Sequence, residues 1–338
     1  MTASTVDISS ASAVGADRRH LPPVVTFLVR RLGALLLVVW VVEIATFLMV
    51  HVMPGDPARN VLGPHASAQA VASLRHQLGL DRPVLQQYWH YTWNALHLHF
   101  GTSFYSHLPV FGELNARIGP EVELIGLAVL TILVVGVGVG IWSAVATRES
   151  RHPRAESAFL LLTGIGGSIP GYVLATVLAL VFAVTLKVFP VAGSSTASSV
   201  VLPALSIALP QAALFARIVR VETLNSLAQN YVRSARSKRL SSRALYLRYI
   251  LPNVLTAALT LSGAIFAQSI GSAIIVENIF AWNGLGLLLT QSVLHLDYPM
   301  VQAAALFLAV VVVLVNTVID VAVSFTDPRS AASRGLEF

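Results

Sequence analysis

The chain has 338 residues, of which 55% are hydrophobic and 11% charged, and its mean hydropathy is +0.73. Soluble domains carry about 25% charged residues, so this composition excludes an ordinary soluble domain and indicates an integral membrane protein. The net charge of +6 is no sign of nucleic-acid binding, because membrane proteins gather Lys and Arg on their cytoplasmic side. A cysteine count of 0 excludes disulfides, thiolate catalysis and Cys-based metal sites.

The N-terminal residues 1–26 are rich in Ser, Ala and Pro and predict a disordered cytoplasmic tail rather than a cleaved signal peptide. Crossing the membrane takes about 20 apolar helical residues. Six segments meet that requirement, at about 32–52, 123–146, 158–188, 200–221, 254–276 and 300–325. The shorter apolar stretch 282–296 predicts an interfacial or re-entrant helix. We therefore expect an all-α, polytopic fold with six transmembrane helices.

Prolines and glycines on these spans predict helix kinks and close helix–helix contacts. Pro170, Pro203 and Pro210 lack a backbone donor and should kink their helices. The pairs Gly136/Gly140 and Gly167/Gly171 are spaced for close helix–helix approach. The glycine-rich "GIGGSIPG" follows no strand, so it does not indicate a phosphate-binding loop.

The distribution of basic residues predicts the topology. With the N-terminus inside, 17 of the 22 Lys and Arg residues fall on cytoplasmic segments and five on external ones. Both termini are then cytoplasmic, including a second tail at 327–338. The expected organisation is a first span with an extracytoplasmic segment at 27–120 and a five-helix core at 121–326.

The external segment 53–120 is too long for a tight turn. Its helical periodicity and its cluster of Tyr88, Trp89, Tyr91 and Trp93 predict a subdomain that receives a partner protein, or equally a set of interfacial anchors. His97 and His99 hint at metal binding, but ordinary surface histidines explain them better.

Two acidic residues lie in the spans. Glu43 is in the middle of the first span, where a charge costs roughly 3 kcal/mol, so it should line a pathway or make a buried structural hydrogen bond. Asp320, near the inner end of the last span, is expected to hydrogen-bond between helices.

The densest basic run of the chain is 229–249, and residues 223–248 predict a helix–turn–helix on the inner membrane face. Lipid headgroups could attract its arginines. Lipid anchoring does not explain the interleaved small residues Ser234, Ala235 and Ser237, which suit a helix that seats in another protein's groove.

The stretch "NYVRSARSKRL", residues 230–240, resembles the cytoplasmic loop motif of bacterial ABC importer permeases of the dipeptide, oligopeptide and nickel family. The matching positions are Tyr231, Arg233, Ala235, Arg236, Lys238 and Leu240. Arg239 stands where the family has glycine, a residue used where the backbone needs a positive φ. Blocks from residue 27 to residue 329 extend the resemblance, including "MPGDPA", "PVFGELNARIGPEVEL" and "VENIFAWNGLGLLL".

The resemblance implies a type I ABC importer permease in a bacterial cytoplasmic membrane. It would pair with a second permease chain, two cytoplasmic ATPase subunits and an extracytoplasmic binding protein. The chain has no G-x-x-x-x-G-K-[ST] motif, so ATP and Mg²⁺ would be held by the ATPases, and this chain is expected to need no cofactor and to have no catalytic residue. Tyr231 and Ala235 would fill the ATPase groove, and Arg233, Arg236 and Lys238 would form its polar rim.

Peptides are the expected substrates. Nickel or another small solute is the alternative within the family. A secondary transporter would instead show inverted repeats and charged mid-membrane sites; the sequence has one mid-span carboxylate, Glu43, and no repeat. An intramembrane enzyme would show a motif such as HExxH or GxSxG, and the sequence has neither motif.

Overall fold

The computed structural model describes residues 23–52, 56–63, 65–77, 79–148, 152–238 and 241–326. These ranges contain helices and no strand, apart from one antiparallel bridge between Thr102 and Pro109. Within them, six helices are long and apolar enough to cross a membrane, or seven if one bent pair counts as a span. The all-α, multi-span prediction is confirmed. The expected tails at 1–26 and 327–338 lie almost wholly outside the described residues.

The first span is α1 (Pro23–Val52), and three short helices follow it. They are α2 (Pro57–Leu62), α3 (Ala68–Gln77) and α4 (Val84–Leu96). The turn into α2 uses Asp56, whose side chain accepts a hydrogen bond of 3.0 Å from Ala58 N and pairs with Arg75 at 2.9 Å. Asp before Pro is a favoured helix start, because proline has no N–H to satisfy and Asp satisfies the next one.

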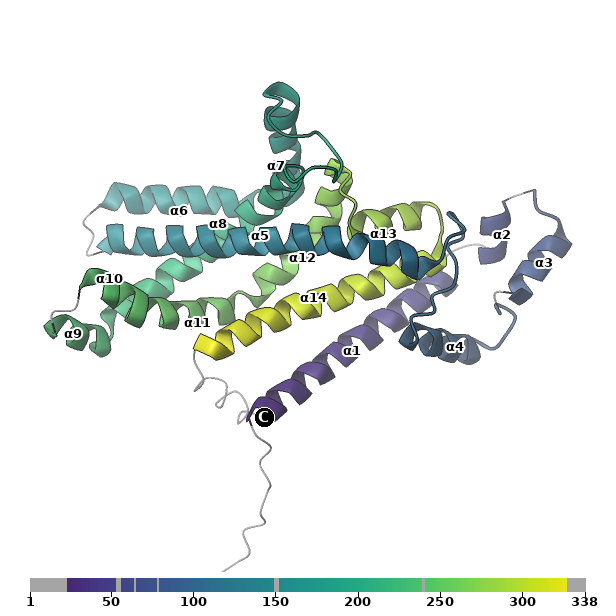
Figure 1. The fold of residues 1–338 in the computed structure, drawn as a ribbon, viewed down its shortest axis with the longest axis horizontal. Helices are drawn as coiled ribbons and strands as arrows, with labels where there is room; N and C mark the ends of the chain where they lie inside the picture. The colour runs from purple at the N-terminus through teal and green to yellow at the C-terminus, as the bar shows by residue number, and fades with distance from the viewer. Residues whose placement is uncertain are drawn as a thin grey trace, which may run out of the picture.

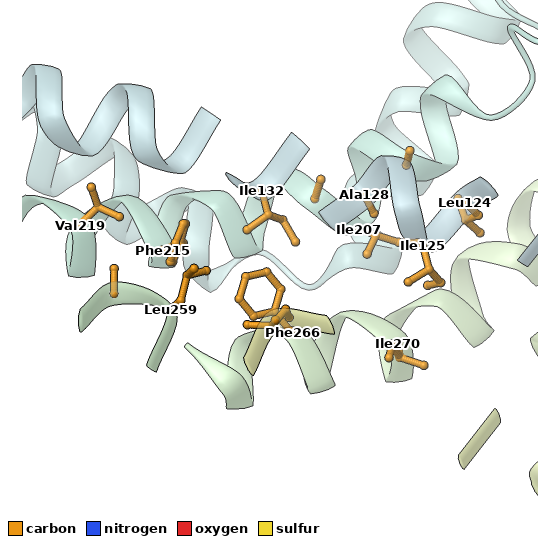
Figure 2. Packing of buried hydrophobic residues seen from close by; sticks show 14 of the residues in the cluster. Leu124, Ile125, Ala128, Ile132, Ile207, Phe215, Val219, Leu259, Phe266 and Ile270 are labelled. Carbon is orange, nitrogen blue, oxygen red and sulfur yellow. The ribbon is translucent and has the colours of Figure 1, made fainter. Parts of the chain in front are cut away.

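Helix α8 (Val201–Ala228) is the centre of the bundle and packs along α5 (Val110–Ala146) (Figure 1). Both glycines of the predicted α5 pair lie at this contact. A Cβ on Gly136 would lie 2.6 Å from Phe215 Cδ1, and a Cβ on Gly140 would lie 2.7 Å from the Ala216 carbonyl. The spacing therefore allows close backbone approach, as predicted. Figure 2 shows the apolar side chains that fill the adjoining core; the Phe215 and Phe266 rings meet edge to face at 5.9 Å.

The expected third span, 158–188, is not one kinked helix. It is divided into α6 (Pro153–Ser168) and α7 (Gly171–Leu178), which continues as a π-helical segment at Ala179–Thr185. The two parts are bent by 95°. Proline disfavours the α conformation in the residue before it, and Ile169 is accordingly extended, so α6 ends ahead of Pro170. In contrast, α8 continues as helix through Pro210.

The expected fifth span, 254–276, is also divided. After α8 come α9 (Asn230–Ser237), α10 (Ser242–Leu245) and a π-helical turn at Tyr246–Ile250. Helices α11 (Leu251–Leu261) and α12 (Gly263–Phe280) then meet at Ser262, whose hydroxyl donates to the Ala258 carbonyl at 2.5 Å. A Ser-Gly pair is a common helix break.

The last two helices are α13 (Leu285–Leu294) and α14 (Tyr298–Thr326). The short apolar helix predicted at 282–296 is thus confirmed as α13. A second apolar cluster joins the start of α5 to both helices through Val110, Leu114, Leu285, Leu288 and Met300. Helices α9 and α10 lie at one end of the molecule, and α2, α3, α4 and α13 lie at the other (Figure 1).

Substituting Gly140 by Ala tests the close contact. The added Cβ would lie 2.7 Å from Ala216 O and from two Val219 atoms, and overpacking of this kind costs about 1–3 kcal/mol. We expect a lower melting temperature in detergent. Gly138→Ala is the matched control, because a Cβ there meets nothing within 4 Å. Equal melting temperatures for the two variants would contradict this packing.

Candidate functional site

The basic segment begins where α8 ends. Gln229 is extended (ψ 152°) and separates α8 from α9. One side of α9 is buried within this chain, where Val232 is 1% and Ala235 4% exposed. Both belong to the same apolar cluster as Leu227 and Leu245. The segment is therefore docked onto the end of the bundle and is not a free loop.

The other side of α9 is available to a partner. Tyr231 is 37% exposed, and its hydroxyl is hydrogen-bonded to that of Ser226. The remaining exposed residues of α9 and its end, among those the structure describes, are Asn230, Arg233, Ser234, Ser237 and Lys238. The motif predicts that Tyr231 and Ala235 fill a partner's groove together, but the structure turns Ala235 into this chain's own core. The side chain of Arg236, and all of Arg239 and Leu240, lie outside what the structure describes.

A buried arginine fixes the part of α8 that leads to this segment. Arg220 is 8% exposed, and its Nη2 donates to Glu156 Oε1 at 2.6 Å and to Thr147 Oγ1 at 3.1 Å. Its guanidinium also lies 5.5 Å from the centroid of the Phe159 ring. The three partners belong to the end of α5 and to α6, so one side chain joins three elements shortly before the chain enters α9.

The opposite end of the bundle holds two buried carboxylates, Glu121 of α5 and Glu277 of α12, both 0% exposed. Glu121 Oε2 accepts a hydrogen bond from Leu285 N at 2.9 Å, and Glu277 Oε2 accepts one from Leu287 N at 2.8 Å. Two backbone N–H groups at the start of α13 thus donate hydrogen bonds to carboxylates from two other helices. A helix N-terminus favours negative charge, so the arrangement fixes α13 in place.

Two glycines make room for these carboxylates. A Cβ on Gly284 would lie 2.5 Å from Glu277 Oε2 and 2.8 Å from Glu121 Oε2. A Cβ on Gly286 would lie 3.0 Å from Glu277 Oε2 and 2.7 Å from Ile274 Cα. The block "ENIFAWNGLGLLL" therefore places a carboxylate and the glycines that accommodate it in one segment.

Neighbouring contacts complete this junction. Trp282 is 1% exposed and donates from its indole to the Pro120 carbonyl at 3.1 Å. Arg117 donates to the Asn283 side chain at 2.7 Å. The acceptor of this bond is the amide oxygen of Asn283.

Neither Glu121 nor Glu277 is among the residues predicted from the sequence. A signal was present: Glu277 is the one charged residue between 249 and 296 in an apolar stretch, and intramembrane carboxylates are costly unless partnered. The partners are backbone N–H groups of α13, which no side-chain pattern reveals.

Glu43 lies close to α4. It is 6% exposed, and its Oε1 has no hydrogen-bond partner among the described residues. Next to it on α1, the Phe47 ring contacts Tyr88 and Tyr91 of α4 at 5.3 and 6.2 Å. Burial, and to a smaller extent Glu43, raise the pKa of Tyr91 above its ordinary value. Within the described residues Glu43 is buried close to α4, and the pathway and structural roles given for it both stay predictions. For Asp320, the structure describes no side chain.

The outer face of α4 is apolar. Leu85, Trp89, Trp93 and Leu96 are between 55% and 80% exposed. The face suits a membrane interface or a partner protein, the same two alternatives that the sequence leaves open. His97 and His99 stack 6.4 Å apart, and His97 Nδ1 lies 2.8 Å from the Trp93 carbonyl.

The apolar spans are those of a multi-pass membrane protein, with the docked basic segment at one end and the carboxylate-held helix at the other. Residues 136–331 match the family model "Binding-protein-dependent transport system inner membrane component", and residues 24–123 match the model of its N-terminal region. The chain belongs to this family of ABC importer permeases of the bacterial inner membrane.

Several curated proteins are similar to the chain. The "Glutathione transport system permease protein GsiC" of Escherichia coli (strain K12) is 36% identical over 302 residues, which cover 89% of this chain and 97% of that protein. The proteins of the same name from Shigella flexneri serotype 5b (strain 8401) and Salmonella typhi show the same identity and coverage.

Replacing Glu277 by Leu should destabilise the α13 junction. The Leu287 N–H would lose its acceptor, and a buried unsatisfied donor costs about 1–3 kcal/mol. We expect a lower melting temperature in detergent. Glu123→Leu on α5 is the control, because Glu123 is exposed. A melting temperature unchanged in Glu277→Leu would show that this contact does not hold α13.

Placing a carboxylate at residue 235 should also destabilise the chain. Ala235 is 4% exposed, so Ala235→Glu would bury an unpaired charge under α9. The adjacent Ser234 is exposed, and Ser234→Glu should leave the melting temperature unchanged. An unchanged melting temperature in Ala235→Glu would mean that Ala235 is free to enter a partner's groove.

Proposed function

We propose that this chain is a permease subunit of an ATP-driven importer for short peptides, with glutathione as the first candidate. The observation that carries the proposal is the similarity to permeases named for glutathione transport, which spans 89% of the chain. The same family resemblance keeps nickel or another small solute as the alternative cargo.

Energy would reach the chain through α9. The sequence carries no phosphate-binding G-x-x-x-x-G-K-[ST] motif, so ATP and Mg²⁺ would belong to two partner ATPase subunits. The exposed Tyr231, Arg233 and Lys238 would contact an ATPase groove, while Val232 and Ala235 transmit its movement to the bundle. The contacts of Arg220 support this role, because they join the last part of α8 to the end of α5 and to α6.

The proposed orientation puts both termini and α9 in the cytoplasm. The 17-to-five distribution of the 22 basic residues supports it. Helices α2 to α4 and α13 then lie outside, where a substrate-binding protein would deliver cargo. A second permease chain would complete the path.

Reversing one exposed charge tests the coupling role. Arg233→Glu should weaken co-purification of the ATPases and lower ATP-driven uptake by about tenfold, the loss expected when about 1.4 kcal/mol of contact energy is removed. Arg154→Glu on α6 makes the same charge change at an exposed site away from α9, and should leave both unchanged. Full association and uptake in Arg233→Glu would contradict coupling through this residue.

The cargo is tested in vesicles that contain both permeases, the ATPases and the binding protein. Labelled glutathione should accumulate only with ATP and binding protein present. Accumulation of nickel instead would favour the alternative cargo. Uptake that follows an ion gradient without ATPases would indicate a secondary transporter.

A further inference from the structure

The outward side of helix α4 is apolar, and the helix carries no charged residue. Its residues 84–96 include no Asp, Glu, Lys or Arg. Side chains three or four residues apart share a face of a helix. One such face is exposed and consists of Leu85, Trp89, Trp93 and Leu96. A surface helix normally turns such a face away from water, so this one needs an apolar neighbour.

Contacts with α1 set the depth of α4 in the membrane. The Phe47 ring contacts the Tyr88 and Tyr91 rings of α4 at 5.3 and 6.2 Å. Phe47 belongs to the stretch Leu32–Met49, which is long and apolar enough to cross the membrane. Glu43, which also acts on Tyr91, is one turn further into the span, about 6 Å at 1.5 Å per residue. Helix α4 therefore lies beside the span itself and not above it in water (Figure 1).

The two helices before α4 have the opposite character. Arg75 of α3 pairs with Asp56 at 2.9 Å, and His76 Nδ1 lies 2.7 Å from Asp81 Oδ2, with these side chains partly or largely exposed. Charged groups of this kind are costly in the membrane and suit water. On α1, by contrast, the neighbour of Phe47 is Leu48, which is exposed. The apolar surface of the span thus continues next to α4.

An open hollow runs along α4. It has a volume of about 860 Å³, and its lining includes Trp89, Trp93 and, just before the helix, Arg82. Tryptophan is enriched where the membrane meets water, and a long basic side chain nearby can extend its charge to the lipid headgroups. Apolar side chains with one cation at the rim match a phospholipid, which has apolar chains and an anionic phosphate.

We propose that the outward face of α4 is embedded in the lipid leaflet nearest to the end of α1, with acyl chains packed on Leu85, Trp89, Trp93 and Leu96. In the orientation proposed above this is the outer leaflet, and α2 and α3 lie above it in the external water. Helix α4 then anchors α2 and α3 at the membrane surface, which leaves those two helices, and not α4, to meet a soluble partner. The cargo has no part in this inference.

Spin labels on single cysteines test this placement, since the chain has a cysteine count of 0. Leu85→Cys and Leu96→Cys put labels at the two most exposed apolar positions of the face, which are 80% and 73% exposed. The complex is reconstituted in phospholipid vesicles and measured by electron paramagnetic resonance. Oxygen concentrates in lipid and a nickel chelate stays in water. The ratio of oxygen to nickel collisions should be several-fold higher for both labels than for a label in water.

Two other positions calibrate the ratio. Ser73→Cys, at an exposed site of α3, should be relaxed mainly by the nickel chelate. Leu37→Cys, on the apolar surface of α1 at 58% exposure, should be relaxed mainly by oxygen. The unsubstituted complex gives the background signal of the partner chains.

Three results would overturn the proposal. If both α4 labels respond like Ser73→Cys, the face lies in water. Labels that neither reagent relaxes would show that protein covers the face, as a second permease chain could. An oxygen response that is lost when the binding protein is added would assign the face to that partner instead of lipid.

Discussion

The structure depends on the close approach of α5 and α8. Lipid tails are as apolar as leucine, so helices in a membrane gain little from burying apolar surface against each other and rely on close packing. Gly136 and Gly140 let the α8 backbone and the Phe215 and Val219 side chains come within contact distance. The other helices of the core, α6, α7, α11 and α12, all pack on this central helix.

The two ends of the bundle are fixed to this core by contacts of different kinds, polar and apolar. At one end, Arg220 joins α8 to the ends of α5 and α6, and Val232 and Ala235 anchor α9. At the other end, Glu121 and Glu277 accept the first N–H groups of α13. A partner that moved α9 would therefore also pull on the core against which α9 packs.

Much of this fold could be predicted from the sequence. Apolar length located most of the spans, and glycine spacing located the face of α5 that another helix approaches closely, without identifying α8 as that helix. Proline marked the turn at residue 170 but not its size, because the bend of 95° depends on what the two halves pack against. Local composition also did not reveal that α11 and α12 part at Ser262.

The site was harder to predict. The motif at 230–240 predicts a helix that contacts a partner, but periodicity alone cannot say which face meets a partner and which meets the chain itself. The motif assigns Ala235 to the partner, yet this side chain is buried within the chain. Glu277 escapes prediction because its partners are main-chain groups from a helix that begins eight residues further along.

A cross-link between α6 and α8 tests most directly whether the core moves as one body. A Cβ at Gly166 would lie 3.4 Å from Ala213 Cβ, close to the roughly 3.5–4.5 Å of a disulfide. In this cysteine-free chain, Gly166→Cys with Ala213→Cys should form the bond on oxidation. ATP-driven uptake should then be the same in oxidised and reduced vesicles. Uptake lost on oxidation and restored by reduction would show that α6 and α8 must slide past each other, contrary to a rigid core.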